Sequence, residues 1–300
     1  MREAVRQIQQ MLEQQIYVTD AALATALYLS MALGKPLLVE GPAGVGKTEI
    51  AKALANALET KLIRLQCYEG LDSTTALYEW NYPKQLLHIK LEETSPLSAA
   101  EKEAKIFSEP FLLKRPLLQA ITERERAPVL LIDEIDRSDE EFEAFLLEVL
   151  SDFQVTIPES GTVKATHRPH VILTSNRSRD LSDALRRRCL YHWIDYPSLQ
   201  KELQIVRAKV PALNETVSAE VARVVQATRT MTLSKVPGIA ETLDWANALV
   251  ALNAQQLERD LVLETVGCFV KDESDMQVFK TELESGRLEL NDKPVIKLAE

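Results

Sequence analysis

One segment, Gly41-Pro-Ala-Gly-Val-Gly-Lys47-Thr48, constrains this chain more than any other feature. It follows the phosphate-loop pattern G-x-x-x-x-G-K-[ST] without exception, with an apolar run before it and a helical period after it. Glycines let such a loop curl so that successive N–H groups point at phosphate oxygens, and the start of the next helix adds positive charge. The segment therefore predicts a nucleotide site between a strand and a helix.

Within this segment two side chains carry the expected chemistry. Lys47 places a positive charge on the outer phosphates, and the Thr48 hydroxyl is suited to Mg²⁺. We therefore expect ATP and Mg²⁺ as cofactors. The residues that we expect to contact the nucleotide are Gly41, Pro42, Ala43, Gly44, Val45, Gly46, Lys47, Thr48 and Glu49.

Two later apolar runs end in polar residues, Leu130–Glu134 and Val171–Asn176. Ligands of open α/β sheets bind where the strands end, so these residues are expected near the phosphates. Asp133 would hold Mg²⁺, and Glu134 would act as the general base on the attacking water. Asn176 would orient that water or touch the γ-phosphate. Either run alone also fits a solvated turn, but beside a phosphate loop they predict a hydrolytic site.

Three consecutive arginines, Arg186, Arg187 and Arg188, precede another apolar run. The plain interpretation is a basic, solvated turn. The alternative is an arginine finger that reaches the ATP of a neighbouring subunit and neutralises charge in the transition state.

Apolar runs alternate with helical periods in the first two thirds of the chain, which predicts a parallel sheet with helices on both faces. The expected strands are Pro36–Glu40, Leu62–Cys67, Val129–Ile132, Val171–Thr174 and Tyr191–Asp195. We place a nucleotide domain over residues 1–197, with a β-hairpin at about 154–165. Residues 198–300 are expected to form a small helical domain with a charged tail whose structure after Lys271 is undetermined.

The sequence also predicts several smaller elements. Residues 1–16 are expected to form an amphipathic helix, and a second helix begins after Asp20 and ends at Gly34. Tyr68–Lys84 is predicted to be an elaborated loop, and Leu91–Phe107 a solvated insertion.

Composition narrows the class of protein. The net charge of -10 argues against a protein that mainly grips nucleic acid. Three scattered cysteines fit a reducing cytoplasm and no zinc site. The polar start excludes a signal peptide, and the longest apolar stretch is too short to span a membrane. We therefore expect a cytoplasmic protein with no membrane insertion and no stable nucleic-acid partner.

The order of these motifs resembles the AAA+ ATPases. Cys67–Asp72 and Ala76–Tyr82 resemble the MoxR group among them, as do Val155–Lys164 and Glu241–Ala246. The CoxD-type members are the most similar, and the resemblance extends from about Tyr17 to Phe279.

This resemblance implies a five-stranded αβα domain with a helical lid, assembled as a hexameric ring with ATP between subunits. It gives Lys47, Thr48, Asp133, Glu134 and Asn176 roles in binding and hydrolysis, and makes Arg188 the first choice for the finger and Arg187 the second. It also implies a chaperone-like factor that remodels a protein client. The client would be a metalloenzyme such as a molybdenum-containing carbon monoxide dehydrogenase, and a von Willebrand factor A domain protein would be a partner.

One departure from the resemblance concerns the lid. Many relatives carry an arginine there that contacts the γ-phosphate, but the corresponding stretch Pro237–Glu241 has none.

Two other functions remain open on the same phosphate loop: a small-molecule kinase or switch, and a nucleic-acid motor or loader.

Overall fold

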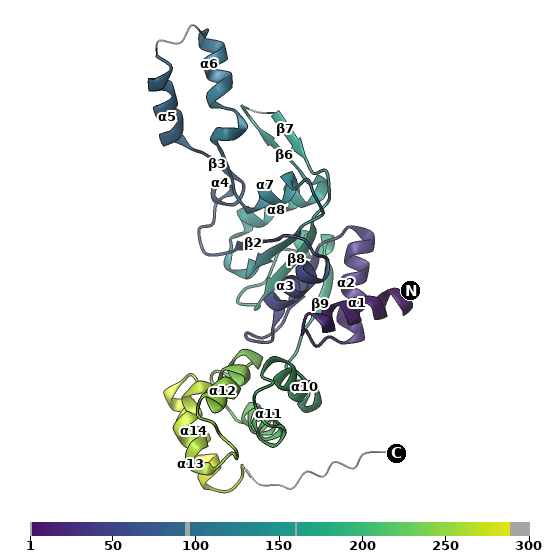
Figure 1. Cartoon of the computed structure of the whole chain (residues 1–300), viewed down its shortest axis with the longest axis vertical. Helices are drawn as coiled ribbons and strands as arrows, with labels where there is room; N and C mark the ends of the chain where they lie inside the picture. Colours follow the sequence, from purple (N-terminus) through teal and green to yellow (C-terminus); the bar gives the residue numbers. More distant parts are fainter. Residues whose placement is uncertain (1, 94–96, 160, 289–300) are drawn as a thin grey trace. The chain divides into compact units, whose positions relative to one another are not determined.

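The computed structural model describes residues 2–93, 97–159 and 161–288. The chain divides into two compact units (Figure 1). The first unit contains most of the chain up to Trp193. The second contains the chain from Ile194 onward, together with two short segments, Ile16–Val18 and Pro42–Gly46.

In the described residues, five parallel strands form the sheet of the first unit, in the order β2-β5-β8-β1-β9. The predicted α/β fold is therefore confirmed. The central strands β1, β5 and β8 are almost entirely buried, as expected for strands covered on both faces. The strands are β1 (Leu37–Glu40), β2 (Leu62–Gln66), β5 (Val129–Asp133), β8 (His170–Ser175) and β9 (Leu190–Trp193).

Alternate residues of these strands face opposite layers of helices. One set, which includes Leu130 and Leu173, forms a cluster with the apolar side chains of α7 and α8. On the strands' other face lies α3, which contacts β2, β5 and β8. The helices of this unit close to the sheet are α1 (Arg2–Gln14), α2 (Ala21–Leu33), α3 (Lys47–Ala57), α7 (Pro116–Thr122), α8 (Glu140–Asp152) and α9 (Asp183–Arg188).

Helix α2 begins and ends where the sequence predicts. The Leu23 N–H donates to the Asp20 carboxylate at 2.9 Å, which satisfies one of the free donors at the helix start. Gly34 adopts a φ of 61°, a left-handed conformation that closes helices at little cost for glycine.

The region after β2 corrects the prediction of an elaborated loop over Tyr68–Lys84. It contains short regular elements, held by tertiary contacts that periodicity does not show. Trp80 is buried and packs edge-to-face on Phe107, and Asn81 caps the helix that follows. The elements are α4 (Ser73–Ala76), β3 (Tyr78–Trp80), α5 (Tyr82–Leu91), α6 (Ala99–Ile106), η1 (Glu109–Phe111) and β4 (Leu112–Lys114).

The expected insertion over Leu91–Phe107 is thus partly helical, and residues 94–96 lie outside the described residues. Strands β3 and β4 pair antiparallel. The predicted hairpin is present as the antiparallel pair β6 (Gln154–Ile157) and β7 (Gly161–Lys164).

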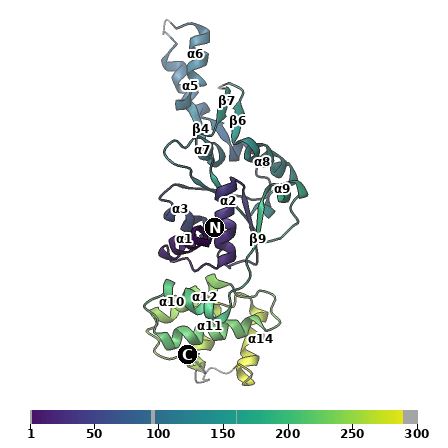
Figure 2. The same ribbon diagram turned by 90° about the vertical axis from the view of Figure 1, so that its right-hand side faces the viewer.

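The second unit is helical, and Figure 2 shows it from another side. Its core centres on Trp245, which stacks on Phe269 at a centroid distance of 4.3 Å, and Phe279 packs edge-on against the same ring. Its elements are α10 (Leu199–Lys209), α11 (Glu215–Arg229), α12 (Ile239–Ala251), α13 (Arg259–Thr265), η3 (Val266–Cys268) and α14 (Glu273–Glu284). The sequence leaves the chain after Lys271 undetermined, and the structure places helix α14 there; residues 289–300 lie outside the described residues.

Candidate active site

The polar residues predicted at strand ends lie at one edge of the sheet. All its strands are parallel, and their register pairs Gln66 with Asp133 and Glu40 with Ser175. The carboxyl ends of β1, β2, β5 and β8 therefore meet where the phosphate loop leaves β1. This is the edge at which open α/β sheets bind ligands.

The phosphate loop requires its glycines. Gly44 and Gly46 have φ values of 74° and 91°, which a side chain would strain. Lys47 is buried, and its ammonium donates to the Gly41 carbonyl oxygen at 2.8 Å. Within the second unit the Gly44 carbonyl oxygen accepts from the Ala240 N–H at 3.2 Å.

Burial changes the protonation of Lys47. Desolvation lowers its pKa to about 8, and the negative charges of Asp136, Asp133 and Glu134 oppose that shift. Lys47 is therefore a cation at neutral pH but loses its proton far more readily than an ordinary lysine.

Asp133 is the centre of a hydrogen-bond network. Its Oδ1 accepts from the Thr174 hydroxyl at 2.5 Å and from the Thr48 hydroxyl at 3.0 Å. Its Oδ2 accepts from the Arg64 guanidinium at 2.6 Å. A carboxylate beside a threonine hydroxyl provides the oxygen donors that Mg²⁺ prefers, so Thr48 and Asp133 fit the expected metal.

Glu134 follows with a positive φ of 55°, rare for a residue with a side chain. Its N–H donates to the Thr174 hydroxyl at 2.9 Å. Its carboxylate accepts from the Gln66 amide at 3.1 Å and from the Asn176 amide at 3.5 Å. The structure thus brings together Glu134 and Asn176, the two residues expected to act on the attacking water.

A buried carboxylate, Asp136, fixes the backbone at Asn176. It accepts from the Asn176 N–H at 3.2 Å and from the N–H and hydroxyl of Ser178 at 2.8 and 2.6 Å. Burial acts to raise the pKa of Asp136, but these hydrogen bonds outweigh it and hold the pKa below its ordinary value.

The three arginines of α9 have different surroundings. Arg186 pairs with the fully buried carboxylate of Glu40 at 3.4 Å, and the Tyr191 hydroxyl donates to the same carboxylate at 3.1 Å. Arg188 donates to the Leu147 carbonyl oxygen at 2.7 Å and to the Ser151 hydroxyl. Arg187 is exposed.

Sequence reasoning missed several members of this site. Arg64, Gln66 and Thr174 are polar residues inside apolar strands, and Glu40 and Asp136 flank recognised motifs. The polarity of these residues was the signal in the sequence that could have identified them. Which residues they touch depends on strand order and register, and those were not predicted.

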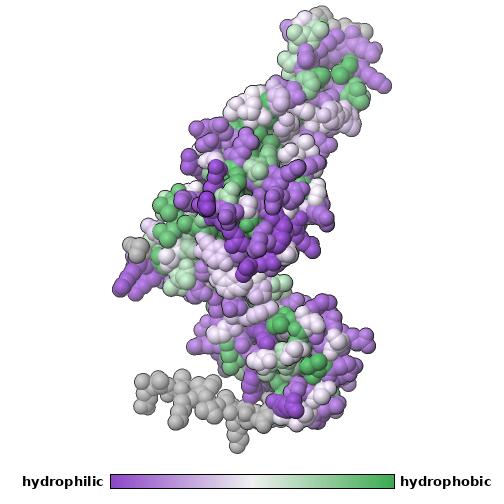
Figure 3. Space-filling model, turned by 180° about the vertical axis from the view of Figure 1, so that it is seen from behind, coloured by the Kyte–Doolittle hydropathy of each residue, from purple (hydrophilic) through white to green (hydrophobic). Residues whose placement is uncertain are grey.

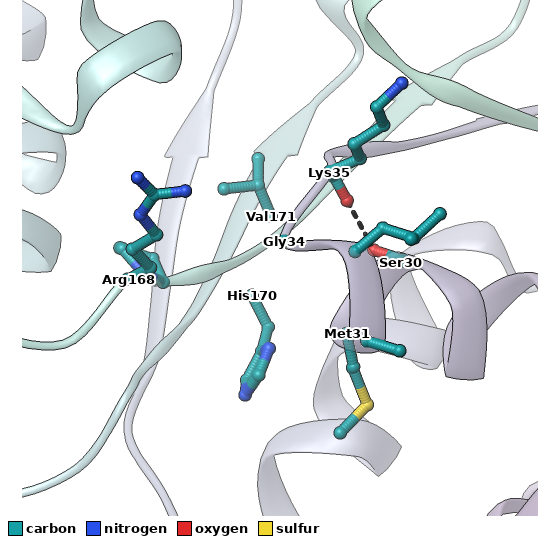
Figure 4. Close-up of a pocket in the computed structure, with 10 residues that line it drawn as sticks. Ser30, Met31, Gly34, Lys35, Arg168, His170 and Val171 are labelled. Carbon is teal, nitrogen blue, oxygen red and sulfur yellow. Dashed lines mark hydrogen bonds between the residues drawn. The ribbon is translucent and has the colours of Figure 1, made fainter.

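A separate cavity of about 310 Å³ lies at the opposite edge of the sheet (Figure 4). The end of α2 and the segment entering β8 line it, with Lys35, Arg168 and His170 among its residues. The Ser30 hydroxyl donates to the Lys35 carbonyl oxygen at 2.7 Å. The cavity borders the amino ends of the strands, so it is no part of the site around Asp133.

Comparison with known proteins gives one family and several distant relatives. Residues 37–194, more than half of the chain, match the family described as ATPase family associated with various cellular activities (AAA). An uncharacterized protein of Staphylococcus haemolyticus is 25% identical over 285 residues, 91% of this chain and 99% of that protein.

Other relatives have named activities. The Holliday junction branch migration complex subunit RuvB of Thermotoga petrophila is 25% identical over 80% of this chain and 73% of its own length. Chaperone protein ClpB 2 of Parasynechococcus marenigrum is 32% identical over 45% of this chain, but that match spans only 13% of ClpB 2.

Among solved structures, the Holliday junction branch migration motor RuvB of Thermotoga maritima is similar over 93% of this chain and 77% of its own, with a TM-score of 0.48 and 20% identity. In the described part of this chain, no helix is both long and apolar enough to cross a membrane.

Proposed function

This chain belongs to the AAA family of ATPases, and from that premise we propose that it uses ATP hydrolysis to remodel a protein client as a member of a ring. The observation that carries the proposal is the convergence of Lys47, Thr48, Asp133, Glu134 and Asn176 at one sheet edge, with a base already held by two amides.

Each of these residues has a proposed role. The loop N–H groups and Lys47 bind the phosphates, while Thr48 and Asp133 hold Mg²⁺, which supplies charge neutralisation when bound. Glu134 removes a proton from the attacking water, and Asn176 orients that water.

The arginine finger is proposed among the residues of α9. Arg186 is committed to Glu40 inside its own chain, so the finger is Arg188 or Arg187. The resemblance favours Arg188. Its hydrogen bonds in the isolated chain, to Leu147 and Ser151, would break when a neighbouring ATP is present.

Helix α5 favours a protein client over nucleic acid. Its residues Tyr82, Leu86, Leu87, Ile89 and Leu91 are all exposed, between 45% and 71%. Exposed apolar clusters usually mark surfaces that bind protein. Figure 3 shows green, hydrophobic atoms at the end of the first unit that carries α5 and α6.

A finer proposal rests on sequence resemblance. The segments that resemble the MoxR group, and its CoxD-type members in particular, support a role in maturing a metalloenzyme such as a molybdenum-containing carbon monoxide dehydrogenase. The same resemblance supports a hexameric ring and a von Willebrand factor A domain partner. The three scattered cysteines support a location in the reducing cytoplasm.

A nucleic-acid motor is the second candidate. The similarity to RuvB over most of this chain favours it, since that relative is named for branch migration at Holliday junctions. The hairpin β6–β7, however, carries a single basic residue, Lys164, and the whole chain has a net charge of -10. Stimulation of hydrolysis by DNA would favour this second function.

The first test measures the mass of the purified protein with ATP and Mg²⁺, for the natural chain and for Glu134→Gln. The variant should bind ATP without hydrolysing it, so a multi-subunit ring should form and persist. Proteins that stay bound to the trapped ring are then candidate clients. If both forms remain monomeric with every nucleotide, the ring proposal fails and a kinase or switch function takes its place.

A further inference from the structure

We propose that Arg64 acts as a built-in competitor of Mg²⁺ at Asp133, so that the site binds its metal only when this guanidinium leaves. The inference rests on the proposed function, because it takes Asp133 as the carboxylate that holds Mg²⁺. It also adds to the site a residue that sets how much Mg²⁺ is required. This residue lies on a strand outside all of the nucleotide motifs.

The two oxygens of Asp133 have different partners. Oδ1 accepts from two neutral hydroxyls, those of Thr174 and Thr48. Oδ2 accepts from Arg64 at 2.6 Å, and its other contact, with the Thr48 hydroxyl, is long at 3.3 Å. Once Arg64 leaves, Oδ2 keeps only the long contact with Thr48, so it is the oxygen that can then accept from metal-bound water.

One partner of this ion pair is shielded from water. The Asp133 side chain is 3% exposed, so its charge is poorly screened by water. The same Arg64 nitrogen also donates to the Gln66 side-chain oxygen at 2.5 Å. Two acceptors thus fix the guanidinium in place. A freely moving surface arginine has no such constraint.

Arg64 also has a route away from the site. It lies on β2, the edge strand of the sheet, and its side chain is 49% exposed. The guanidinium can move into solvent without crossing the core. Since Mg²⁺ and a guanidinium repel each other at such a short distance, binding of the metal and departure of Arg64 are coupled.

The experiment measures binding, with no hydrolysis required. A fluorescent, non-hydrolysable ATP analogue is titrated at a series of Mg²⁺ concentrations. These titrations give the Mg²⁺ concentration at which half of the full increase in affinity for the analogue is reached. In Arg64→Gln this concentration should fall about 3- to 10-fold, because a competing charge is gone. Arg64→Lys should show a smaller fall, since its ammonium lacks the planar fork of donors.

Lys61→Gln is the matched control. It removes the same charge next to the start of β2, but Lys61 pairs with Glu123 and not with Asp133, so the Mg²⁺ requirement should not change. Thermal unfolding of each variant checks the fold, and Arg64→Lys carries the test if Arg64→Gln is unstable.

Two failures are distinguishable. If the natural chain binds the analogue equally well with and without Mg²⁺, the proposed roles of Thr48 and Asp133 fail. If Mg²⁺ strengthens binding in the natural chain, but both Arg64 variants need the same or more of it, the inference about Arg64 alone is overturned.

Discussion

At the scale of single residues, Glu134 combines a strained backbone with a proposed catalytic role. A non-glycine residue with positive φ costs roughly 1–3 kcal/mol, and such residues cluster at active sites. Here the φ of 55° lets the N–H reach Thr174 while the carboxylate lies beside Gln66 and Asn176. The strain therefore supports an orientation that a general base needs.

The first prediction concerns that base. Glu134→Gln should leave ATP affinity within about twofold but lower the hydrolysis rate by about 10²- to 10⁴-fold, the usual contribution of general base catalysis. Phosphate release at a single turnover and equilibrium ATP binding check the two halves. Glu141→Gln, on the exposed side of α8, should behave as the natural chain. Loss of binding in Glu134→Gln would contradict the assigned role.

The second prediction follows from the lowered pKa of Lys47. In the free protein Lys47 is mostly protonated at pH 7, and its positive charge is lost as the pH rises through the pKa of about 8. Because only the cation attracts phosphate, ATP affinity should fall by about tenfold between pH 7 and pH 9. Lys47→Met should bind weakly with no such change. A flat profile in the natural chain would show that Lys47 keeps its proton.

At the scale of elements, a helix or strand could be predicted where its local sequence determines it. Strands β1, β5 and β8 are buried on both faces, so their apolar runs are visible in the sequence. The small elements between β2 and α7 depend instead on contacts such as Trp80 with Phe107. Helix α14 was missed because charges on its exposed face mask Phe279 and Leu283, its two buried apolar residues.

The candidate site divides in the same way. Its loop and its strand-end carboxylates follow spacing rules, and so they were predicted. Arg64 and Gln66 lie beside Asp133 because β2 pairs with β5 in one register, which no local pattern specifies.

The third prediction belongs to the start of α12. A Cβ at Gly238 would lie 2.8 Å from the Gly44 backbone, closer than real contacts allow. Gly238→Ala should therefore displace the phosphate loop and weaken ATP binding by about tenfold or more. In Gly267→Ala the new Cβ would meet Met276 at an ordinary 3.5 Å, so binding should be retained. Equal affinities in the two variants would refute this close-packing argument.

At the scale of the whole molecule, the proposed ring makes each site depend on two chains. An Arg188→Ala chain keeps its phosphate loop but provides no finger, and a Lys47→Ala chain does the opposite. Each alone should lose hydrolysis by about 10³-fold or more. Mixed together they should regain part of it, because fingers from one variant serve ATP on the other.

This fourth prediction is checked by phosphate release across a range of mixing ratios. Arg126 is an exposed arginine of the same domain. In the control, Arg126→Ala takes the place of Arg188→Ala, and this variant should hydrolyse ATP by itself. If Arg188→Ala is active while Arg187→Ala is inactive and is rescued by mixing, the finger is Arg187.

The buried carboxylate of Glu40 has a consequence for such a ring. It directly precedes the phosphate loop, and Arg186 of α9 pairs with it. A movement of the loop on binding ATP would therefore be transmitted through Arg186 to α9, whose next two residues are the proposed fingers. Each subunit would then report the occupancy of its own site to the next, and the rate of hydrolysis should rise cooperatively with ATP concentration.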